Sequence, residues 1–271
     1  MIALTPSSSI LTSTIEPSTN NYRSNYTMKN IFTILSALLK GQLKGHTGQW
    51  AEDVVVRKLF LRSKKQGIYV DLGAHHPFTH SNTAWLWFKG WRGINVDANR
   101  HSITLFNKSR PNDTNLNLAI IPSSQYTGGT RAVDLYLPDE ESCETGDHGI
   151  TATASVDSDI ASERNFQKTE KVDAIDVLTL FKQHHLTEID YLNIDVEGLD
   201  FQILQDIDYN SVKIHAISVE DYCSSIHAAV ESETTKYLQQ HGYDLVSRVG
   251  PTSIFALRES DRLIRNIYNL I

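Results

Sequence analysis

Carboxylates stand at the ends of two apolar runs early in the chain. The first run ends at Asp71 and passes directly into Gly73-Ala74, and the second ends at Asp97. Glycine lets the backbone pass close to a ligand, and in an open α/β sheet ligands bind where the strands end. A carboxylate at the end of the second strand can accept both hydroxyl groups of a ribose. The two segments therefore predict a site for a cofactor that carries a nucleoside.

The loop after Asp71 lacks the glycine patterns that bind phosphate groups. A dinucleotide loop needs G-x-G-x-x-G and a Walker A loop ends in Gly-Lys-Ser/Thr, whereas this loop continues as Gly-Ala-His-His-Pro. A cofactor without phosphate therefore fits better. S-adenosylmethionine has adenine, ribose and a methionine zwitterion, and Asp71 is expected to face its ammonium group, directly or through water.

Further carboxylates follow two later runs that also have the composition of buried strands. Asp195 and Glu197 come after the first of these runs, and Glu220 and Asp221 come at the end of the second. On neighbouring parallel strands Asp195, Glu220 and Asp221 would converge, and close carboxylates repel unless a proton or a cation is present. Oxygen ligands of this kind suit Mg²⁺ or another divalent cation. The alternative is that Asp195 hydrogen-bonds substrate or cofactor while Glu220 and Asp221 cap a helix.

Histidines near the first two segments are candidates for a general base. They are His75, His76, His80 and His101. A neutral imidazole in the cleft can take a proton from an acceptor group. Pro77 holds the preceding His76 extended, which would direct its side chain into the cleft. The alternative is that these are structural or surface histidines.

The predicted elements place these residues at one edge of a sheet. Strands are predicted at 68–71, 93–97, 116–121, 132–137, 191–195, 213–220, 243–249 and 253–257, and helices at 47–61, 81–88, 100–109, 175–184, 199–205 and 231–241. Strands that alternate with helices favour a parallel sheet, and Gly250-Pro251 between the last two strands indicates an antiparallel hairpin. We therefore predict an α/β fold with a seven-stranded, mostly parallel sheet, an antiparallel edge hairpin and helices on both faces.

The chain is predicted to carry segments outside this domain. Residues 1–27 are rich in Ser, Thr and Asn and resemble a disordered leader. Residues 28–46 are predicted to form a helix or an interface segment, which would suit a homodimer contact. The domain then spans 47–258, with a loop insertion at 138–160 in which Thr153 and Ser155 would cover the acceptor, and 259–271 forms a C-terminal helix.

Composition excludes several classes of partner. The 271 residues include 25 Lys and Arg against 32 Asp and Glu, which gives a net charge of −7 and argues against nucleic acid as a partner. The apolar run 31–39 is shorter than the roughly 20 residues that span a bilayer. Two cysteines give no disulfide framework and no zinc motif, so a reducing, cytoplasmic location is expected.

These segments together resemble the FkbM-like family of S-adenosylmethionine-dependent methyltransferases. The matching stretches are Tyr69-Val70-Asp71-Leu72-Gly73-Ala74-His75-His76-Pro77, Ser81-Asn82-Thr83, residues 90–99 and Asn193-Ile194-Asp195-Val196-Glu197-Gly198-Leu199-Asp200. The resemblance covers roughly 47–258. It implies a Rossmann-like class I methyltransferase fold and methyl transfer to oxygen, often on a sugar, a polyketide or another natural product.

The resemblance also implies roles for single residues. Gly73 and Ala74 match the cofactor loop, Asp97 matches the ribose acid, and Asn117 lies near the usual adenine contacts. The carboxylate tips are similar to those of metal-dependent O-methyltransferases, in which a base often lies three residues after the first metal aspartate. That position here is Gly198, so Glu197 and His76 become the candidates for the base.

The sequence therefore predicts an O-methyltransferase that uses S-adenosylmethionine and a small hydroxylated acceptor, with a divalent cation as a possible aid. In this interpretation Asp195 orients the acceptor or binds the cation. Two alternatives belong to other classes: a nicotinamide-dependent sugar oxidoreductase, which the missing G-x-G-x-x-G disfavours, and a non-catalytic cofactor-binding or assembly subunit on the same fold.

Overall fold

The computed structural model describes residues 36, 45–61, 66–126, 128–129, 131–137, 154–164, 166, 168–260 and 263. The chain divides into a unit Met1–Gly45 and a unit His46–Ile271, and every helix and strand with stated bounds below belongs to the second unit. The predicted leader 1–27, almost all of the segment 28–46, loop residues 138–153 and most of the predicted helix 259–271 lie outside the described residues. Those predictions therefore stay predictions.

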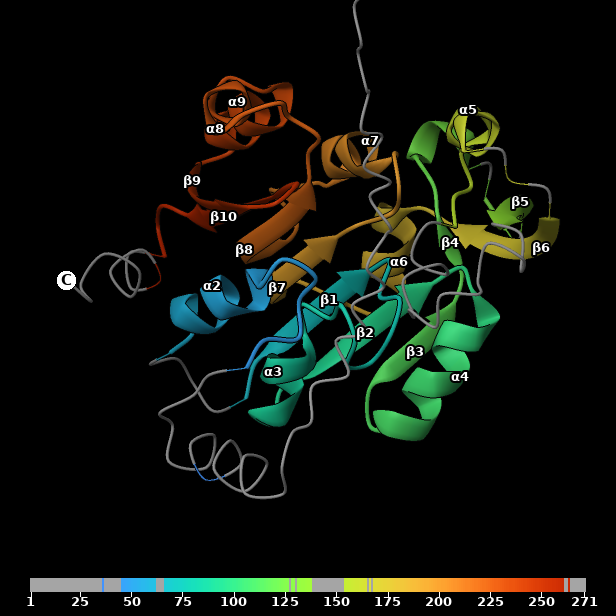
Figure 1. Ribbon diagram of the computed structural model, residues 1–271, viewed down its shortest axis with the longest axis horizontal. Helices are drawn as coiled ribbons and strands as arrows, with labels where there is room; N and C mark the ends of the chain where they lie inside the picture. The colour runs from blue at the N-terminus through green and yellow to red at the C-terminus, as the bar shows by residue number, and fades with distance from the viewer. Residues whose placement is uncertain are drawn as a thin grey trace, which may run out of the picture. The chain divides into compact units, whose positions relative to one another are not determined.

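Seven strands form the main sheet, in the order β3-β2-β1-β7-β8-β10-β9 (Figure 1). The first five run parallel to one another, whereas β10 runs antiparallel to both β8 and β9. This arrangement confirms the predicted α/β fold with its antiparallel edge hairpin. The strands are β1 Ile68–Leu72, β2 Arg92–Asp97, β3 Thr114–Asn117, β7 Glu188–Ile194, β8 Lys213–Glu220, β9 Tyr243–Val249 and β10 Thr252–Leu257.

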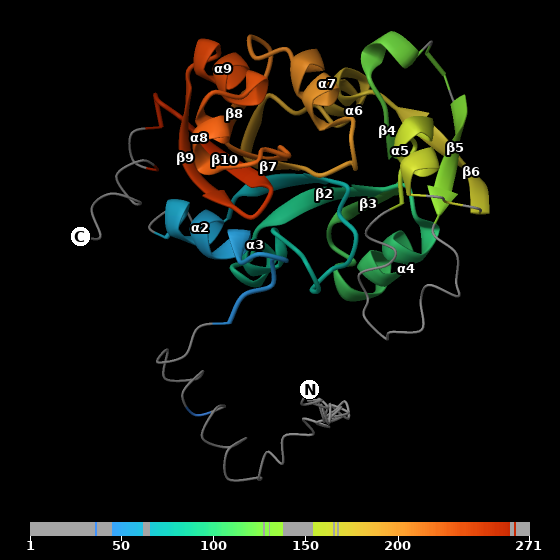
Figure 2. The same ribbon diagram turned by 45° about the horizontal axis from the view of Figure 1, so that its top comes forward.

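Helices cover both faces of this sheet. Helices α2, α3 and α4 lie on one side, and α6, α7 and α9 lie on the other (Figure 2). Their bounds are α2 Glu52–Leu59, α3 Ala84–Phe88, α4 Arg100–Ser109, α6 Val177–Gln183, α7 Asp200–Asp206, α8 Ile226–Val230 and α9 Glu233–Gln240. In the part of the chain that the structure describes, no helix has both the length and the apolar character needed to cross a membrane.

The strands are buried on both faces, which explains why they read as nearly continuous apolar runs. In β1, Val70 and Leu72 join a core with α6 and α7, whereas Tyr69 packs with α2 and α3 on the opposite face. Asp71 shares the face of Tyr69 because side chains alternate along a strand. The central strand therefore presents a buried carboxylate to the layer that contains α3.

A second, three-stranded sheet with the order β4-β6-β5 lies beside the main one. It consists of β4 Ala119–Ile120, β5 Arg131–Leu137 and β6 Lys168–Ile175, and α5 Ser158–Glu163 packs against it. The predicted strand 132–137 is confirmed as β5. The single strand predicted at 116–121 is wrong, because the chain leaves the main sheet after Asn117 and pairs β4 with β6. The strand β6 was not predicted.

Several predicted boundaries also need correction. The helix predicted at 81–88 begins at Ala84, and the strand predicted at 191–195 begins at Glu188. The helix predicted from Thr47 begins only at Glu52, because the Thr47 hydroxyl donates to the carbonyl of Ser81 (2.7 Å) rather than capping a helix. The helix predicted at 175–184 begins at Val177, where Asp176 supplies the cap. The loop predicted to reach residue 160 ends earlier, because Asp157 caps α5 through the backbone N–H groups of Asp159 and Ile160.

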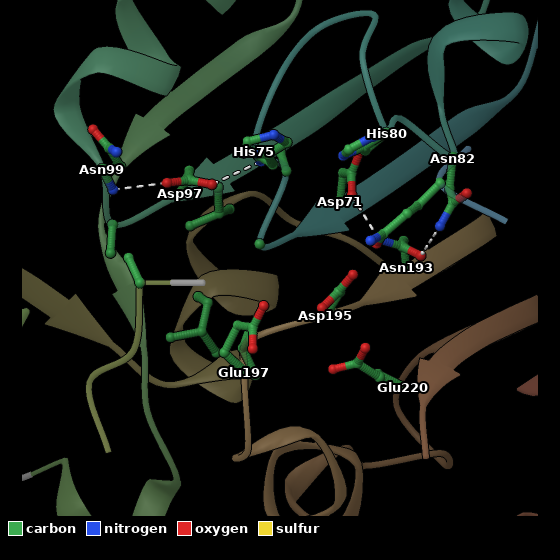
Figure 3. Close-up of a pocket in the computed structure, with 18 of the residues that line it drawn as sticks. Asp71, His75, His80, Asn82, Asp97, Asn99, Asn193, Asp195, Glu197 and Glu220 are labelled. Carbon is green, nitrogen blue, oxygen red and sulfur yellow. Dashed lines mark hydrogen bonds between the residues drawn. The ribbon is translucent and has the colours of Figure 1, made fainter. Parts of the chain in front are cut away.

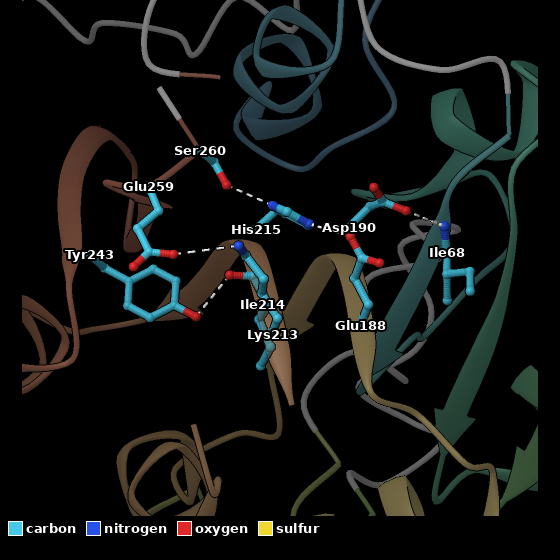
Figure 4. A network of polar contacts seen from close by, with 9 residues as sticks. All are labelled: Ile68, Glu188, Asp190, Lys213, Ile214, His215, Tyr243, Glu259 and Ser260. Atoms are coloured by element: carbon cyan, nitrogen blue, oxygen red, sulfur yellow. Dashed lines mark hydrogen bonds and ion pairs between the residues drawn. The ribbon is translucent and has the colours of Figure 1, made fainter. Parts of the chain in front are cut away.

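At the amino ends of the central strands, polar contacts tie residues 259–260 to the sheet (Figure 4). The His215 ring bridges Ser260 Oγ (2.6 Å) and Glu188 Oε1 (2.7 Å), and Lys213 pairs with Glu259 at 3.4 Å. These contacts involve β7, β8 and the segment that follows β10. They anchor the chain at the edge opposite the carboxyl ends of the parallel strands.

Candidate functional site

A cavity of about 360 Å³ opens at the carboxyl ends of the parallel strands (Figure 3). This volume lies in the range of small-molecule sites, and the location is where open α/β sheets bind ligands. The loops after β1, β2, β7 and β8, the start of α2 and the small sheet supply its wall. Seven predicted site residues line it: Asp71, Gly73, Ala74, Asp97, Asp195, Glu197 and Glu220.

At the cavity floor, the backbone at Gly73 packs tightly against the ends of β2 and β7, and we call this contact the Gly73 crossing. The N–H groups of Gly73 and Ala74 both donate to the carbonyl of Val96, at 2.9 and 3.0 Å, and Asp195 N–H donates to the carbonyl of Leu72 at 2.9 Å. A β-carbon on Gly73 would lie 1.7 Å from the carbonyl oxygen of Asp195, and Gly73 has a φ of +78°. Only glycine fits here, and it brings the ends of β1, β2 and β7 together.

Asp97 joins the first two segments at one side of this crossing. Its Oδ2 accepts the backbone N–H of His75 and its Oδ1 accepts that of Asn99, both at 2.7 Å. Burial raises the pKa of Asp97 to about 6, although both N–H groups lower it, so the carboxylate is ionised at neutral pH. The Ser102 side chain also interacts with this carboxylate, and its remaining lone pairs can accept hydroxyl groups.

The predicted adenine residue Asn117 does not line the cavity. Its amide nitrogen donates to the carbonyls of Asp97 (3.1 Å) and Ala98 (2.8 Å), so it holds the loop after β2 in place. The adjoining wall is apolar and includes Leu118, Ile120, Leu135 and Val156. It contains residues of β4 and β5, so the small sheet supplies part of this apolar wall.

Asp71 lies deeper than predicted, in a row of polar side chains that crosses the sheet. Strand register places Asp71 beside Asn95 and Asn193, and Asn193 beside Ser218. The Asp71 carboxylate accepts from Thr83 Oγ1 (2.7 Å) and from Asn193 Nδ2 (2.9 Å). Burial raises its pKa, and the Thr83 hydrogen bond opposes that change. Both carboxylate oxygens are thus engaged within the protein.

Arg110 holds the loop above this row, and no sequence pattern singled it out. The side chain is fully buried. Its Nη1 donates to the hydroxyls of Thr83 (2.9 Å) and Tyr69 (3.2 Å), and its Nη2 donates to Ser81 Oγ (3.1 Å) and to the carbonyl of Pro77. These partners lie 27 to 41 residues before it in the chain, so no local spacing marks the contact.

The opposite end of the cavity is acidic. Asp195 follows β7 and Glu220 ends the neighbouring strand β8, and their carboxylates face the same space (Figure 3). Burial raises the pKa of Glu220 to about 7, with a further increase from Glu197. The pKa of Asp195 is also raised, first by burial and then by Glu220. At neutral pH a proton therefore resides on this group of carboxyls part of the time.

Glu197 is held by Ser155, from the end of the loop insertion, and by Arg164, which follows α5. Its carboxylate pairs with Arg164 at 2.7 Å, and its carbonyl accepts the hydroxyl of Ser155 at 3.0 Å. Burial raises the pKa of Glu197, and Arg164 lowers it. Ser155 was predicted to cover the acceptor, and it instead fixes the loop after β7; Thr153 lies outside the described residues.

The predicted metal triad is not assembled. The Asp221 carboxylate accepts the hydroxyl of Ser232 (2.8 Å) and does not line the cavity, unlike Asp195 and Glu220. Across the described residues, no three His, Cys, Asp or Glu side chains gather as a metal site would require. The physical reason is position: Asp221 lies one residue beyond the end of β8, where the chain turns toward α8.

The predicted base His76 also lies outside the cavity wall. Its Nδ1 accepts the backbone N–H groups of Phe78 (3.1 Å) and Thr79 (2.9 Å), which makes it part of the turn. His75 and His80 line the cavity instead, with their rings stacked at 6.0 Å. A residue before proline prefers an extended backbone, but this preference did not indicate which histidine side chain would line the cavity.

Comparison with protein families gives one match. A family model described as a methyltransferase FkbM domain matches residues 71–245. The matched stretch begins at Asp71 in β1 and ends within β9, so it contains Gly73, Asp97, Asp195 and Glu220. Searches of curated proteins and of solved structures returned no match.

Proposed function

The chain belongs to the FkbM methyltransferase domain family, and on this premise we propose that it methylates a hydroxyl group of a sugar, a polyketide or another small natural product. Family membership implies S-adenosylmethionine as the methyl donor. The observation that carries the proposal is the Gly73 crossing with Asp97 beside it, because the two offer a close backbone approach and a pair of hydroxyl acceptors in one cavity.

The hydrogen bonds of the loop favour a cofactor without phosphate. Phosphate groups bind to free backbone N–H groups at such loops. Here the N–H groups of Gly73 and Ala74 are bonded to Val96, and that of His75 is bonded to Asp97. This arrangement argues against the nicotinamide alternative, since a dinucleotide pyrophosphate would find these three donors already engaged.

The residues present fit S-adenosylmethionine, whose sulfonium supplies the methyl group when it is bound. Asp97 would accept the ribose hydroxyls, and the apolar wall at Leu118 and Ile120 would contact the adenine. The acceptor hydroxyl would lie at the acidic end between Asp195 and Glu220. Holding both reactants in one geometry contributes about 7–11 kcal/mol toward lowering a barrier.

Glu220 is the best proton acceptor in the cavity. Its Oε2 is buried and has no hydrogen-bond partner within the described part of the chain. Glu197, one of the two predicted bases, is instead paired with Arg164. A base with a pKa near 7 works well at neutral pH. Glu220 would thus take the hydroxyl proton while Asp195 orients the acceptor, and neither role calls for a metal ion.

The first test is cofactor binding. Calorimetric titration of the full chain with S-adenosylhomocysteine is expected to show micromolar affinity, and NAD is expected not to bind. Asp97→Ala removes the acceptor of both ribose hydroxyls and should weaken S-adenosylhomocysteine binding by roughly 10²–10⁴-fold, since hydrogen bonds to a charged group contribute about 1.5–3 kcal/mol each. Asp97→Asn keeps one acceptor oxygen, so its affinity for S-adenosylhomocysteine should lie between those of the wild type and Asp97→Ala.

Two outcomes would overturn this assignment. If Asp97→Ala bound as tightly as the wild type, the ribose would lie elsewhere. If the wild type bound no S-adenosylhomocysteine, the non-catalytic assembly subunit would become the better interpretation of the fold.

The second test concerns the proton acceptor. With an acceptor found by screening hydroxylated sugars and polyketides for turnover, the methyl-transfer rate should rise with pH and level off above about 7, as Glu220 becomes ionised. Glu220→Gln should lower the rate by roughly 10²–10⁴-fold and remove this rise, while S-adenosylhomocysteine still binds. An unchanged pH profile in the variant would rule out Glu220 as the base.

A further inference from the structure

We propose that Glu52 and Asn82 bind the α-ammonium group of the cofactor's methionine end. The inference rests on the proposed function, because it takes S-adenosylmethionine as the ligand. Both residues line the cavity, Glu52 from the first turn of α2 and Asn82 from the loop before α3. Glu52 lies outside the residues that the family model matches, so the family match gives it no role.

A chain of hydrogen bonds fixes which way the Asn82 amide points. Arg110 can only donate, so Thr83 Oγ1 accepts from it and in turn donates to Asp71. Asn193 presents its Nδ2 to the Asp71 carboxylate and its Oδ1 to Asn82. Asn82 therefore donates through Nδ2 (3.2 Å), which leaves its Oδ1 on the other side of the amide.

The Oδ1 of Asn82 needs a hydrogen-bond donor. Asn82 is only 7% exposed, and its Oδ1 is buried without a hydrogen-bond partner among the described residues. A buried polar atom left unpaired destabilises the protein, so such atoms usually have a partner in the functional state. The partner of an amide oxygen must be an N–H or O–H group.

Glu52 supplies a negative charge beside the Oδ1 of Asn82. A β-carbon placed on Gly48 would lie 2.4 Å from Glu52 Oε2 and 2.8 Å from Asn82 Oδ1, so the two oxygens flank one point. Glu52 is 3% exposed and accepts from the Trp50 N–H (2.9 Å) and weakly from Thr252 Oγ1 (3.5 Å), but no described cation pairs with it. Burial raises its pKa. A cationic ligand group would balance this buried carboxylate.

The position of the pair agrees with the direction in which the cofactor would extend. Asp97, proposed for the ribose, lies on one side of the cavity, and Asn82 and Asn193 lie on the other, next to Asp71 (Figure 3). The methionine end would extend from the ribose past Gly73 toward Asn82. Asp71 was predicted to meet the ammonium group, but the charge of Arg110 already stabilises its carboxylate, whereas no described cation pairs with Glu52, so Glu52 and Asn82 take that role.

The test compares ligands that differ only at the amino-acid end. The full chain is titrated with S-adenosylhomocysteine, with its desamino analogue and with 5′-methylthioadenosine, which lacks the whole amino-acid group. In the wild type the desamino analogue should bind at least 10-fold more weakly than S-adenosylhomocysteine. Glu52→Gln, which keeps the oxygen that accepts from Trp50, should weaken S-adenosylhomocysteine roughly 10- to 100-fold and leave the other two ligands unchanged.

Asp176→Asn is the matched control. Asp176 is buried, caps α6 through its side chain and does not line the cavity, so its substitution should change the affinities for all three ligands by the same factor. Equal weakening of all three by Glu52→Gln, or equal affinity of the wild type for S-adenosylhomocysteine and its desamino analogue, would overturn the inference. If none of the three ligands bound the wild type, the proposed function itself would fail instead.

Discussion

Gly73→Ala is expected to lower the free energy of unfolding by about 2–5 kcal/mol and to abolish binding of S-adenosylhomocysteine. A left-handed φ costs a non-glycine residue about 1–2 kcal/mol, and overpacking adds about 1–3 kcal/mol. The added β-carbon would lie 1.7 Å from a backbone oxygen of Asp195, and backbone cannot rotate away as a side chain can. Denaturation in urea and calorimetric titration measure the two effects.

Gly128→Ala is the control for Gly73→Ala, because it introduces the same backbone strain without the steric clash. Gly128 has a φ of +82°, close to the +78° of Gly73, but nothing lies within 4 Å of its virtual β-carbon. The control should therefore lose only the strain of about 1–2 kcal/mol and keep its cofactor affinity. Equal losses in the two variants would show that the packing of Gly73 against the end of β7 contributes nothing to stability or to binding.

Arg110→Met is expected to be the most damaging substitution outside the cavity wall. Methionine fills similar space but removes four donated hydrogen bonds and the charge that opposes burial of Asp71. Removing one partner from a buried charged network costs about 3–5 kcal/mol. The loss should appear in urea denaturation. Weaker binding of S-adenosylhomocysteine should accompany it, because Pro77 and Ser81 lose their anchor.

Arg258→Met is the surface counterpart of this variant. Arg258 pairs with Asp244 at 2.7 Å, but about half of its side chain is exposed, so its removal should cost no more than about 1 kcal/mol. If Arg110→Met were no more destabilising than Arg258→Met, the buried network would not be the element that holds the loop after β1.

Several elements of the fold could be predicted because their signals are local. Strands β8 and β9 and helix α4 begin and end at the predicted residues 213–220, 243–249 and 100–109. Buried parallel strands read as short apolar runs, and a side-chain cap such as Asn99 marks a helix start. The position of Asp97, Asp195 and Glu220 at one edge of the sheet could also be predicted, because each lies at the end of a predicted strand.

The small sheet could not be predicted in the same way. Strand β6 reads Lys-Thr-Glu-Lys-Val-Asp-Ala-Ile, which has few apolar residues, and its partner β5 lies far away in the chain, beyond the loop insertion. Its pairing depends on long-range contacts rather than on local preference. For the same reason, the apolar part of the cavity wall that this sheet supplies was not predicted, and the resemblance pointed to Asn117 instead.

By itself, the sequence determined which strands end on carboxylates, that Gly73 allows a close approach, and the family to which the chain belongs. Only the tertiary structure decided what each side chain does there. It turned Asp221 and His76 away from the cavity, paired Glu197 with Arg164, and brought Arg110 under a loop at least 27 residues before it. Strand periodicity gives the face on which a residue lies, whereas hydrogen-bond direction depends on partners from other strands. The free oxygen of Asn82 therefore becomes apparent only when Arg110, Thr83, Asp71 and Asn193 are in register.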